Sequence, residues 1–200
     1  MTISLAIDTS TSRTSVAVVE DGALLWQGYR DGATSHGYAL PSLVAQGLAQ
    51  NANIEQVVVG MGPGPYTGLR VGIAFARTFS LARNIPITGI CSLDAIAAQV
   101  IEKNDFIVAT DARRKEVYWA RYRDGVRVNI PYVDRPSVIQ SIGLPLFGEG
   151  AVKYSIAESD EGQFPDLLWL ISLSNKTELQ MDEPLYIRRP DAVPTSERLP

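Results

Sequence analysis

The sequence predicts an α/β fold of two related lobes, each built from one β-β-β-α unit. Shifting the chain on itself by 103 residues places Asp8 on Asp111 and the Asp21-Gly22 pair on Asp124-Gly125. In both halves a buried strand ends in the aspartate, and an Asp-Gly turn later joins two further strands. Two matches at one offset indicate an internal duplication. We therefore expect a first lobe at residues 1–103 and a shortened second lobe at residues 104–200, with a late helix able to pack back on the first lobe.

The two units rest on elements that follow one another in a regular order. Strands are expected at short apolar or alternating runs, and helices where apolar residues recur every three or four positions. The expected strands are 3–7, 15–20, 23–28, 57–60, 86–90, 106–111, 117–123, 126–133 and 144–147. The expected helices are 35–50, 67–83, 92–103 and 165–175, and residues 136–141 fit a short helix or a turn. Residues 152–160 fit helix or strand, residues 185–188 a strand or extended segment, and residues 191–200 a loose tail.

The composition is that of an ordinary globular protein, with 46% hydrophobic and 20% charged residues. A net charge of −4 gives no general attraction to nucleic acid or to an anionic membrane. The single cysteine, Cys91, excludes an internal disulfide and suits a reducing cytosol. With one histidine, His36, the chain has too few ligands for a structural zinc site. No signal peptide and no membrane-spanning apolar run are expected, so the predicted location is the cytoplasm.

A glycine-proline stretch at residues 60–72 joins an apolar strand to a helix and invites comparison with a phosphate-binding loop. The Walker pattern fails, because Thr67 stands where its second glycine is needed and no lysine follows Gly68. Pro63 and Pro65 also lack the N–H groups with which such loops hold phosphate. The stretch is therefore interpreted as a rigid turn that fixes the entry of the helix, with Thr67 as its N-cap.

The helix at residues 67–83 carries two apolar arcs, whereas a surface helix carries one. The arcs are Val71, Phe75, Phe79 and Ala82 on one side, and Leu69, Ile73, Ala76 and Ser80 on nearly the opposite side. One arc can pack on a sheet. The other is rich in small residues and needs a second helix, from this chain or from a partner.

Four segments give the chain a specific family resemblance. They are residues 5–10, 62–72, 111–120 and 183–188, which read LAIDTS, GPGPYTGLRVG, DARRKEVYWA and EPLYIR. The duplicated unit resembles the actin, Hsp70 and sugar-kinase (ASKHA) superfamily, in which each lobe presents a hairpin to nucleotide phosphates. Within it, the four segments together are similar to the TsaB (YeaZ) family. Pro65-Tyr66 departs mildly from the family's usual turn, and residues 126–175 match loosely.

This resemblance implies a role in making N6-threonylcarbamoyladenosine beside the anticodon of tRNAs that read codons starting with A. The implied role is that of a non-catalytic subunit, an inactive paralogue that pairs with the TsaD transferase. The resemblance also implies a complex containing the TsaE ATPase, a homodimer when the chain is alone, tRNA contact only through the complex, and no membrane. No cofactor is expected to be required by this subunit, although ATP or ADP could bind at the cleft or at the partner interface.

We expect partner binding through the first lobe, where two helices from each chain would form a four-helix contact. The small residues of helices 35–50 and 67–83 favour close helix approach. The expected interface residues are Ala39, Leu43, Gly47, Leu69, Arg70, Gly72, Ile73, Ala76, Arg77 and Ser80. On this interpretation Ala76→Arg leaves the fold intact and abolishes pairing.

The nucleotide-facing residues are expected to be vestigial. Active superfamily members place glycine after the strand-ending aspartate, but here Ser10 and Arg113 stand at the corresponding positions after Asp8 and Asp111. A side chain at each hairpin tip crowds a tight phosphate site. The metal site of the transferase subunit resembles an HxxxH helix motif, in which Leu40 here replaces the second histidine after His36. No catalytic residue and no metal site are therefore expected.

Three alternatives compete with the subunit role. The chain could be an autonomous ATP-binding kinase or ATPase of the same fold, against which the missing glycines count. A protease using Cys91 and His36 has no evident third member. Direct RNA contact is a minor hypothesis based on six basic residues interleaved with aromatic residues, for which a solvated hairpin face is the simpler interpretation: Arg113, Arg114, Lys115, Arg121, Arg123 and Arg127.

Overall fold

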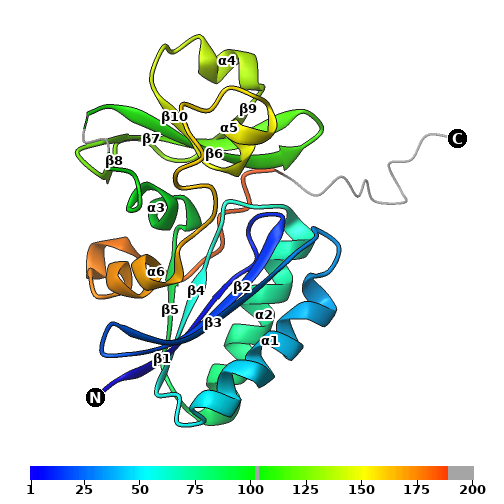
Figure 1. Cartoon of the computed structure of the whole chain (residues 1–200), viewed down its shortest axis with the longest axis vertical. Helices are drawn as coiled ribbons and strands as arrows, with labels where there is room; N and C mark the ends of the chain where they lie inside the picture. Colours follow the sequence, from blue (N-terminus) through cyan, green and yellow to red (C-terminus); the bar gives the residue numbers. More distant parts are fainter. Residues whose placement is uncertain (102–103, 189–200) are drawn as a thin grey trace, which may run out of the picture.

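The computed structural model describes residues 1–101 and 104–188, which form two lobes stacked along the long axis of the molecule (Figure 1). The first lobe contains a six-stranded sheet of order β11-β5-β4-β1-β2-β3. Its strands are β1 (Ile3–Asp8), β2 (Arg13–Glu20), β3 (Ala23–Asp31), β4 (Gln56–Gly60), β5 (Ile87–Ile90) and β11 (Gln180–Met181). β1 is central, antiparallel to β2 and parallel to β4.

Both faces of this first sheet are covered. The helices α1 (His36–Gln50) and α2 (Tyr66–Arg83) cover one face, and α6 (Leu167–Ser174) covers the other (Figure 1). Because side chains alternate along a strand, Leu5 and Ile7 pack toward α1 and α2 whereas Ala6 packs toward α6. The side chain of Asp166 caps α6 by accepting a hydrogen bond from the Trp169 amide at 2.9 Å.

The second lobe is a smaller sheet of order β10-β6-β7-β8, with one further strand on β7. Its strands are β6 (Phe106–Arg113), β7 (Glu116–Arg123), β8 (Val126–Arg127), β9 (Tyr132–Asp134) and β10 (Leu146–Phe147). The short helices α4 (Pro136–Gln140) and α5 (Glu149–Lys153) belong to this lobe, and α3 (Ser92–Ala97) packs beneath the sheet on its side facing the first lobe (Figure 1).

Strand pairing confirms the duplication expected from the sequence. β6 is antiparallel to β7 and parallel to β10, as β1 is antiparallel to β2 and parallel to β4. Asp8 and Asp111 lie at corresponding places in the two units, at the carboxyl-terminal end of the first strand. The fold is thus a mixed α/β arrangement of two lobes, each built on its own sheet, as expected from the sequence.

Several elements differ from expectation. The helix α2 begins at Tyr66 after Pro65, so Thr67 lies inside it and caps nothing. The helix α3 ends at Ala97, short of the expected residue 103, which lies outside the described residues. The expected strand 126–133 is divided into β8 and β9. Residues 154–160 form neither helix nor strand, although the sequence fits either over 152–160. At residues 185–188 there is no strand, so of the two alternatives only the extended segment remains. The tail at 191–200 lies outside the described residues.

The first lobe is completed by residues from the far end of the chain. The helix α6 packs on its sheet, and β11, through a one-turn 3₁₀ helix η1 (Thr177–Leu179), joins the sheet antiparallel to β5. The lobes are therefore not separated in sequence at residue 103. Within the described residues, no helix is both long and apolar enough to cross a bilayer.

Candidate functional site

The turn after β1 is the first-lobe position that the superfamily resemblance connects with phosphate. Asp8 is 1% exposed. Its Oδ1 accepts from the amide and the hydroxyl of Ser10, each at 2.8 Å, and its Oδ2 accepts from the Ser92 hydroxyl at 2.6 Å. Burial raises the pKa of Asp8, while these hydrogen bonds act in the opposite direction. Both carboxylate oxygens thus accept hydrogen bonds from the chain itself, one within the turn and one from the start of α3.

The glycine-proline stretch lies directly on this turn, which explains its glycines. The backbone of Ser10 stands where a Gly64 side chain would be, with Ser10 Cα only 2.8 Å from the position of an added Cβ. Thr9 Oγ1 donates to the Gly68 carbonyl at 2.8 Å and accepts from the Gly72 amide at 3.1 Å. A side chain at Gly72 would collide with the same hydroxyl. The start of α2 therefore covers the turn, as a rigid element placed by residues 60–72.

His36 lies at the start of α1 behind the same turn. It is buried, its Nδ1 shares a hydrogen bond of 2.8 Å with Thr14 Oγ1, and its Nε2 lies against Gly68. Burial lowers the pKa of His36, and the positive charge of Arg113 lowers it further. Leu40, one turn along, belongs to the apolar core. Among the described residues no group of three or more His, Cys, Asp or Glu could hold a metal ion.

The corresponding aspartate of the second lobe is engaged by charge. Asp111 Oδ2 accepts from Lys153 Nζ at 2.6 Å and lies 3.6 Å from the Arg113 guanidinium. Its Oδ1 accepts from the Arg113 amide and the Tyr154 hydroxyl, both at 3.1 Å. Side chains at Gly148 or Gly150 would collide with the backbone of β6, so α5 and its lysine lie close to the strand end. Of the four residues predicted to face nucleotide, Asp8, Ser10 and Asp111 are buried and Arg113 is partly exposed.

Glu149 connects the two turns and was not found from the sequence. Its Oε2 accepts from the Ser12 hydroxyl of the first lobe at 2.7 Å. Its other oxygen is buried without a hydrogen-bond partner. Burial raises the pKa of Glu149, and the charge of Asp111 adds to that effect, whereas the Ser12 hydroxyl lowers it. A glutamate between two glycines is a weak signal, and its partner is 137 positions away.

The segment 182–188, which carries the last family motif, crosses from one lobe to the other (Figure 1). Arg77 donates to the Asp182 carbonyl at 2.7 Å, and the Leu185 amide donates to Met61 at 2.9 Å. The Tyr186 ring lies 5.1 Å from the Tyr66 ring. Arg188 then donates to the Ala112 carbonyl at 3.0 Å and pairs with Glu116. The segment therefore ties α2 to the β6–β7 hairpin.

Most side chains expected at a partner interface are in the core of the first lobe. Eight of the ten are buried, namely Ala39, Leu43, Gly47, Leu69, Gly72, Ile73, Ala76 and Ser80; Arg70 and Arg77 are exposed. The small-residue arc of α2 faces the sheet, α1 and the Thr9 turn of its own chain, so the second helix that it needs is supplied internally. The expectation that Ala76→Arg spares the fold is corrected accordingly, because Ala76 has no exposed surface.

The outward face of α1 and α2 consists of other residues. Tyr38 on α1 and Leu81 on α2 are 64% and 83% exposed. The apolar arc of α2 that contains Phe75 and Phe79 is only partly buried, and the two rings stack with their centroids 6.2 Å apart. A shallow hollow of about 330 Å³ lies along the first turns of α2, lined by Tyr66, Thr67, Arg70, Val71 and Ala74. Whether chains pair through these two helices stays a prediction; the available surface is this outward face.

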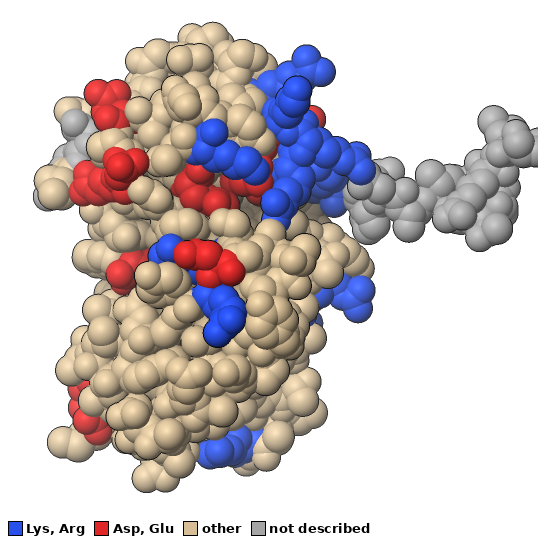
Figure 2. Space-filling view, turned by 45° about the vertical axis from the view of Figure 1, so that its right-hand side comes forward, with Lys and Arg blue, Asp and Glu red and all other residues tan. Residues whose placement is uncertain are grey.

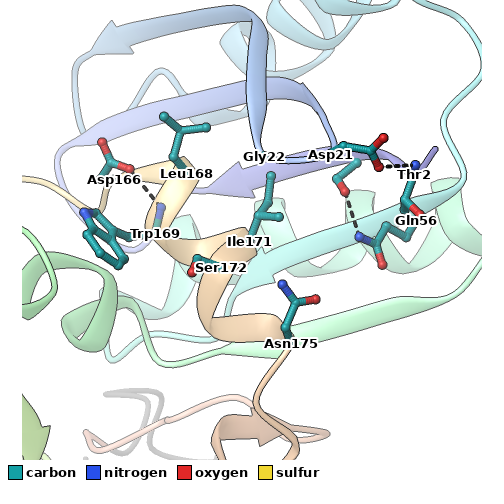
Figure 3. Close-up of a pocket in the computed structure, with 11 residues that line it drawn as sticks. Thr2, Asp21, Gly22, Gln56, Asp166, Leu168, Trp169, Ile171, Ser172 and Asn175 are labelled. Carbon is teal, nitrogen blue, oxygen red and sulfur yellow. Dashed lines mark hydrogen bonds between the residues drawn. The ribbon is translucent and has the colours of Figure 1, made fainter.

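A pocket of about 760 Å³ lies at the opposite end of β1 from Asp8 (Figure 3). It is formed by α6, the start of β1 and β4, and the β2–β3 turn. Three pairs of its polar groups are hydrogen-bonded: the Thr2 amide donates to Asp21 at 2.7 Å, Gln56 donates to Ser4 at 2.7 Å, and the Trp169 amide donates to Asp166 (Figure 3). It contains no cysteine, histidine or basic side chain. The pocket thus lacks a nucleophile–base pair.

Cys91 and His36 do not form the catalytic pair of a cysteine protease either. Cys91 is completely buried beneath the second sheet, and burial raises the pKa of its thiol far above the usual range. His36 is hydrogen-bonded to Thr14 instead. The thiolate that such chemistry needs is therefore suppressed.

Comparisons with known proteins agree with the fold and the motifs. The protein-family model described as TsaD, tRNA N6-adenosine threonylcarbamoyltransferase, matches residues 31–172. An uncharacterized protein of Mycobacterium tuberculosis is 40% identical over 200 residues, covering 95% of this chain and 93% of that protein. The Escherichia coli tRNA threonylcarbamoyladenosine biosynthesis protein TsaB is 33% identical over 126 residues, covering 60% of this chain and 54% of that protein.

A solved structure of YeaZ from Pseudomonas aeruginosa superposes with a TM-score of 0.69 at 25% identity, covering 88% of this chain and 91% of that one. The four motifs, the duplicated topology and these relatives lead to one assignment. The chain belongs to the TsaB (YeaZ) family.

Proposed function

We propose that the chain is a non-catalytic subunit for synthesis of N6-threonylcarbamoyladenosine in tRNA. In this role it acts in the cytoplasm as the partner of a TsaD-type transferase, which carries out threonylcarbamoyl transfer to the adenosine beside the anticodon. The names of its TsaB relatives and of the matching family model support the pathway. The remaining question is why this copy of the fold would act through a partner.

One observation carries the non-catalytic role: the chain itself occupies both strand-end turns that the superfamily presents to phosphate. In the first lobe the Gly64 backbone lies against Ser10, and Thr9 is bonded to Gly68 and Gly72. In the second lobe Lys153 lies on Asp111. Both aspartates are almost completely buried, so a metal–phosphate group at either would have to displace these contacts. Leu40, in place of a second histidine, is likewise unsuited to metal binding.

The outward face of α1 and α2 is the surface we propose for pairing, either with the transferase subunit or with a second copy of this chain. It combines exposed Tyr38 and Leu81, half-covered Phe75 and Phe79, and the hollow beside Tyr66. Aromatic residues with a few arginines at the margin are typical of protein interfaces. A TsaE-type ATPase and tRNA would then meet this chain within the assembly, and any ATP or ADP would bind at the cleft or at the shared interface.

Size-exclusion chromatography with light scattering, with and without the transferase subunit of the same organism, tests the pairing. Ala74→Arg places a charge on the outward face of α2, where Ala74 is exposed beside the hollow. We expect it to fold normally and to weaken pairing at least tenfold. Val126→Arg, at an exposed position in the second lobe, is the matched control and should pair normally. Normal pairing by Ala74→Arg would reject this surface.

A modification assay on a tRNA transcript tests the pathway. Synthesis of the modified adenosine should require both subunits and should fall with Ala74→Arg in proportion to lost pairing. The autonomous kinase or ATPase is tested by incubating the purified chain with ATP and magnesium. ATP turnover by the chain alone, abolished by Asp8→Asn, would replace the subunit role with that alternative.

A further inference from the structure

The tip of the β6–β7 hairpin carries a concentrated positive charge. Figure 2 shows Lys and Arg side chains gathered on one side of the second lobe, whereas they are scattered elsewhere on that view. The hairpin patch, as it is called below, consists of three basic residues of this tip and three from neighbouring segments: Arg113, Arg114 and Lys115, and Arg135, Lys153 and Arg188. The chain as a whole has a net charge of −4, so the patch opposes the general charge of the molecule.

Contacts bring three members of the hairpin patch together at the end of β6. Arg113 and Lys153 both lie on Asp111, and Arg188 bonds to the Ala112 carbonyl and pairs with Glu116. Arg135 follows Asp134, which is paired in register with Val117 at the same end of β7. The nearby acids are directed inward or paired: Asp111 is buried, Glu116 is paired with Arg188, Asp134 accepts from Trp119 and Glu149 accepts from Ser12. Among the described residues here, six basic side chains therefore stand against these four acids.

The backbone beneath these charges is strained. Three successive residues, Arg113, Arg114 and Lys115, have φ of 64°, 53° and 61°, in the left-handed region that residues with a side chain rarely adopt. Arg113 and Glu116 are paired, which leaves Arg114 and Lys115 as a two-residue hairpin loop. Loops of this kind, left-handed at both positions, strongly favour Asn-Gly or Asp-Gly.

Two other hairpin loops of this chain have the same backbone geometry and can be compared with the Arg114-Lys115 loop. Its two other two-residue hairpin loops, also left-handed at both positions, are Asp21-Gly22 and Asp124-Gly125, the favoured pair in each case. Only the loop in the hairpin patch uses long basic side chains in that geometry, among the residues described. The Arg114-Lys115 loop is strained although an Asp-Gly pair would relieve the strain. This indicates that the two basic side chains have a function of their own.

We propose that the hairpin patch binds the phosphate backbone of RNA directly. The inference rests on the proposed function, because that function provides a tRNA substrate. Phosphate contacts need several long cationic side chains spread over a surface and no apolar centre. An acidic protein partner fits less well, because protein interfaces are depleted of charge at their centre and the patch contains only charged residues.

Direct binding of an unmodified tRNA transcript that reads an A-starting codon tests this proposal, by fluorescence anisotropy at about 50 mM salt. The variant Arg114→Asn/Lys115→Gly gives the loop its favoured residues and removes two charges. We expect about tenfold weaker RNA binding, a salt dependence of log K reduced by about 1.4 for two lost phosphate contacts, and a Tm raised by roughly 2–4 °C. A purely structural loop would change only the Tm.

The double variant Arg30→Gln/Lys176→Gln removes the same charge at exposed positions away from the patch and should bind RNA within about twofold of the parent chain. If the Asn-Gly variant fails to fold, Arg114→Gln/Lys115→Gln carries the RNA test. Undiminished RNA binding by the patch variant, equal loss in the control, or no RNA binding by the parent chain would overturn the proposal. Polyglutamate binding with the same loss would assign the patch to an acidic protein instead.

Pairing with the transferase subunit is measured on the same variants without RNA. If the hairpin-patch variant loses RNA binding but pairs normally with the transferase subunit, the result supports direct RNA binding by the patch. Absence of pairing in the parent chain, with RNA binding intact, would reject the proposed function and leave the patch in place.

Discussion

The turn after β1 and the hairpin after β6 occupy corresponding places in the two units, yet they are built in opposite ways. The first has small hydroxyl side chains, is buried, and is covered by the glycine-rich start of α2. The second has three left-handed basic residues, is exposed, and has its aspartate paired with Lys153. The two units thus close the same strand end in two different ways, by backbone packing in one lobe and by charge in the other.

The largest loss of stability is expected from a substitution that forces α2, which covers the first turn, away from the core. Ala76 lies completely buried on the inner face of α2. Ala76→Arg would bury an unpaired charge and overpack the core, so we expect a loss of at least about 4 kcal/mol in the free energy of unfolding. Urea denaturation measures this loss, and Ala74→Arg, on the outward face of the same helix, is the control. A stable Ala76→Arg variant that fails only in pairing would restore the original interface prediction.

A smaller loss of stability is expected when one methyl group is added between the glycine-proline stretch and the first turn. Gly64→Ala would place its Cβ against the backbone of Ser10, which cannot move away as a flexible side chain could. We expect a destabilisation of about 2–3 kcal/mol. Gly37→Ala, where an added Cβ meets nothing within 4 Å, should leave stability unchanged or slightly higher. Equal thermal stability of the two variants would show that the backbone at Gly64 is not tightly packed against Ser10.

The second turn should respond less to loss of its own contact. Lys153→Met removes the ammonium 2.6 Å from Asp111, but the lysine is half exposed and Arg113 and Tyr154 remain. We expect a loss of about 1 kcal/mol, since exposure screens the pair. Thermal denaturation in low and high salt measures it, with exposed Lys176→Met as the control. A loss as large as that of Gly64→Ala would mean that the two turns are closed with equal strength.

Substitution of Glu149, which links the turns, should change stability by no more than Lys153→Met does, and with the opposite sign. Its folded pKa is raised, so the wild-type chain loses stability as pH rises from about 4.5 through that raised pKa. Glu149→Gln stays neutral and can still accept from Ser12. We expect it to be more stable than wild type by about 1 kcal/mol at neutral pH and equal to it at pH 4. Exposed Glu158→Gln should show no such divergence, and a destabilised Glu149→Gln variant at pH 7 would contradict the assignment.

The sequence predicted the parts of the structure that local pattern determines. The duplicated strand–aspartate pattern predicted the corresponding places of Asp8 and Asp111, and periodicity predicted α1, α2 and α6 closely. The apolar arcs of α2 could not be assigned to faces, because a small residue such as Gly72 or Ala76 allows close approach of a partner helix or of the chain's own backbone alike. The answer depends on Thr9, which is 63 positions from Gly72.

Contacts between distant residues were likewise beyond sequence reasoning. Nothing near Glu149 indicates Ser12, and nothing near Lys153 indicates that it lies on Asp111. The family motif at residues 183–188 was recognised, but its path across both lobes follows only from the fold. The basic character of residues 113–115 was visible, whereas their left-handed backbone, which gives the charges their significance, was not.

The placement of α6 and β11 in the first sheet has a consequence for how the chain acquires its structure. During synthesis the first hundred residues leave the ribosome with one sheet face bare and the edge of β5 unpaired, until residues 167–181 follow. Pairings of such sequence separation form late and slowly. The amino-terminal lobe therefore cannot mature first, and chains truncated before residue 167 should expose apolar surface and depend on chaperones.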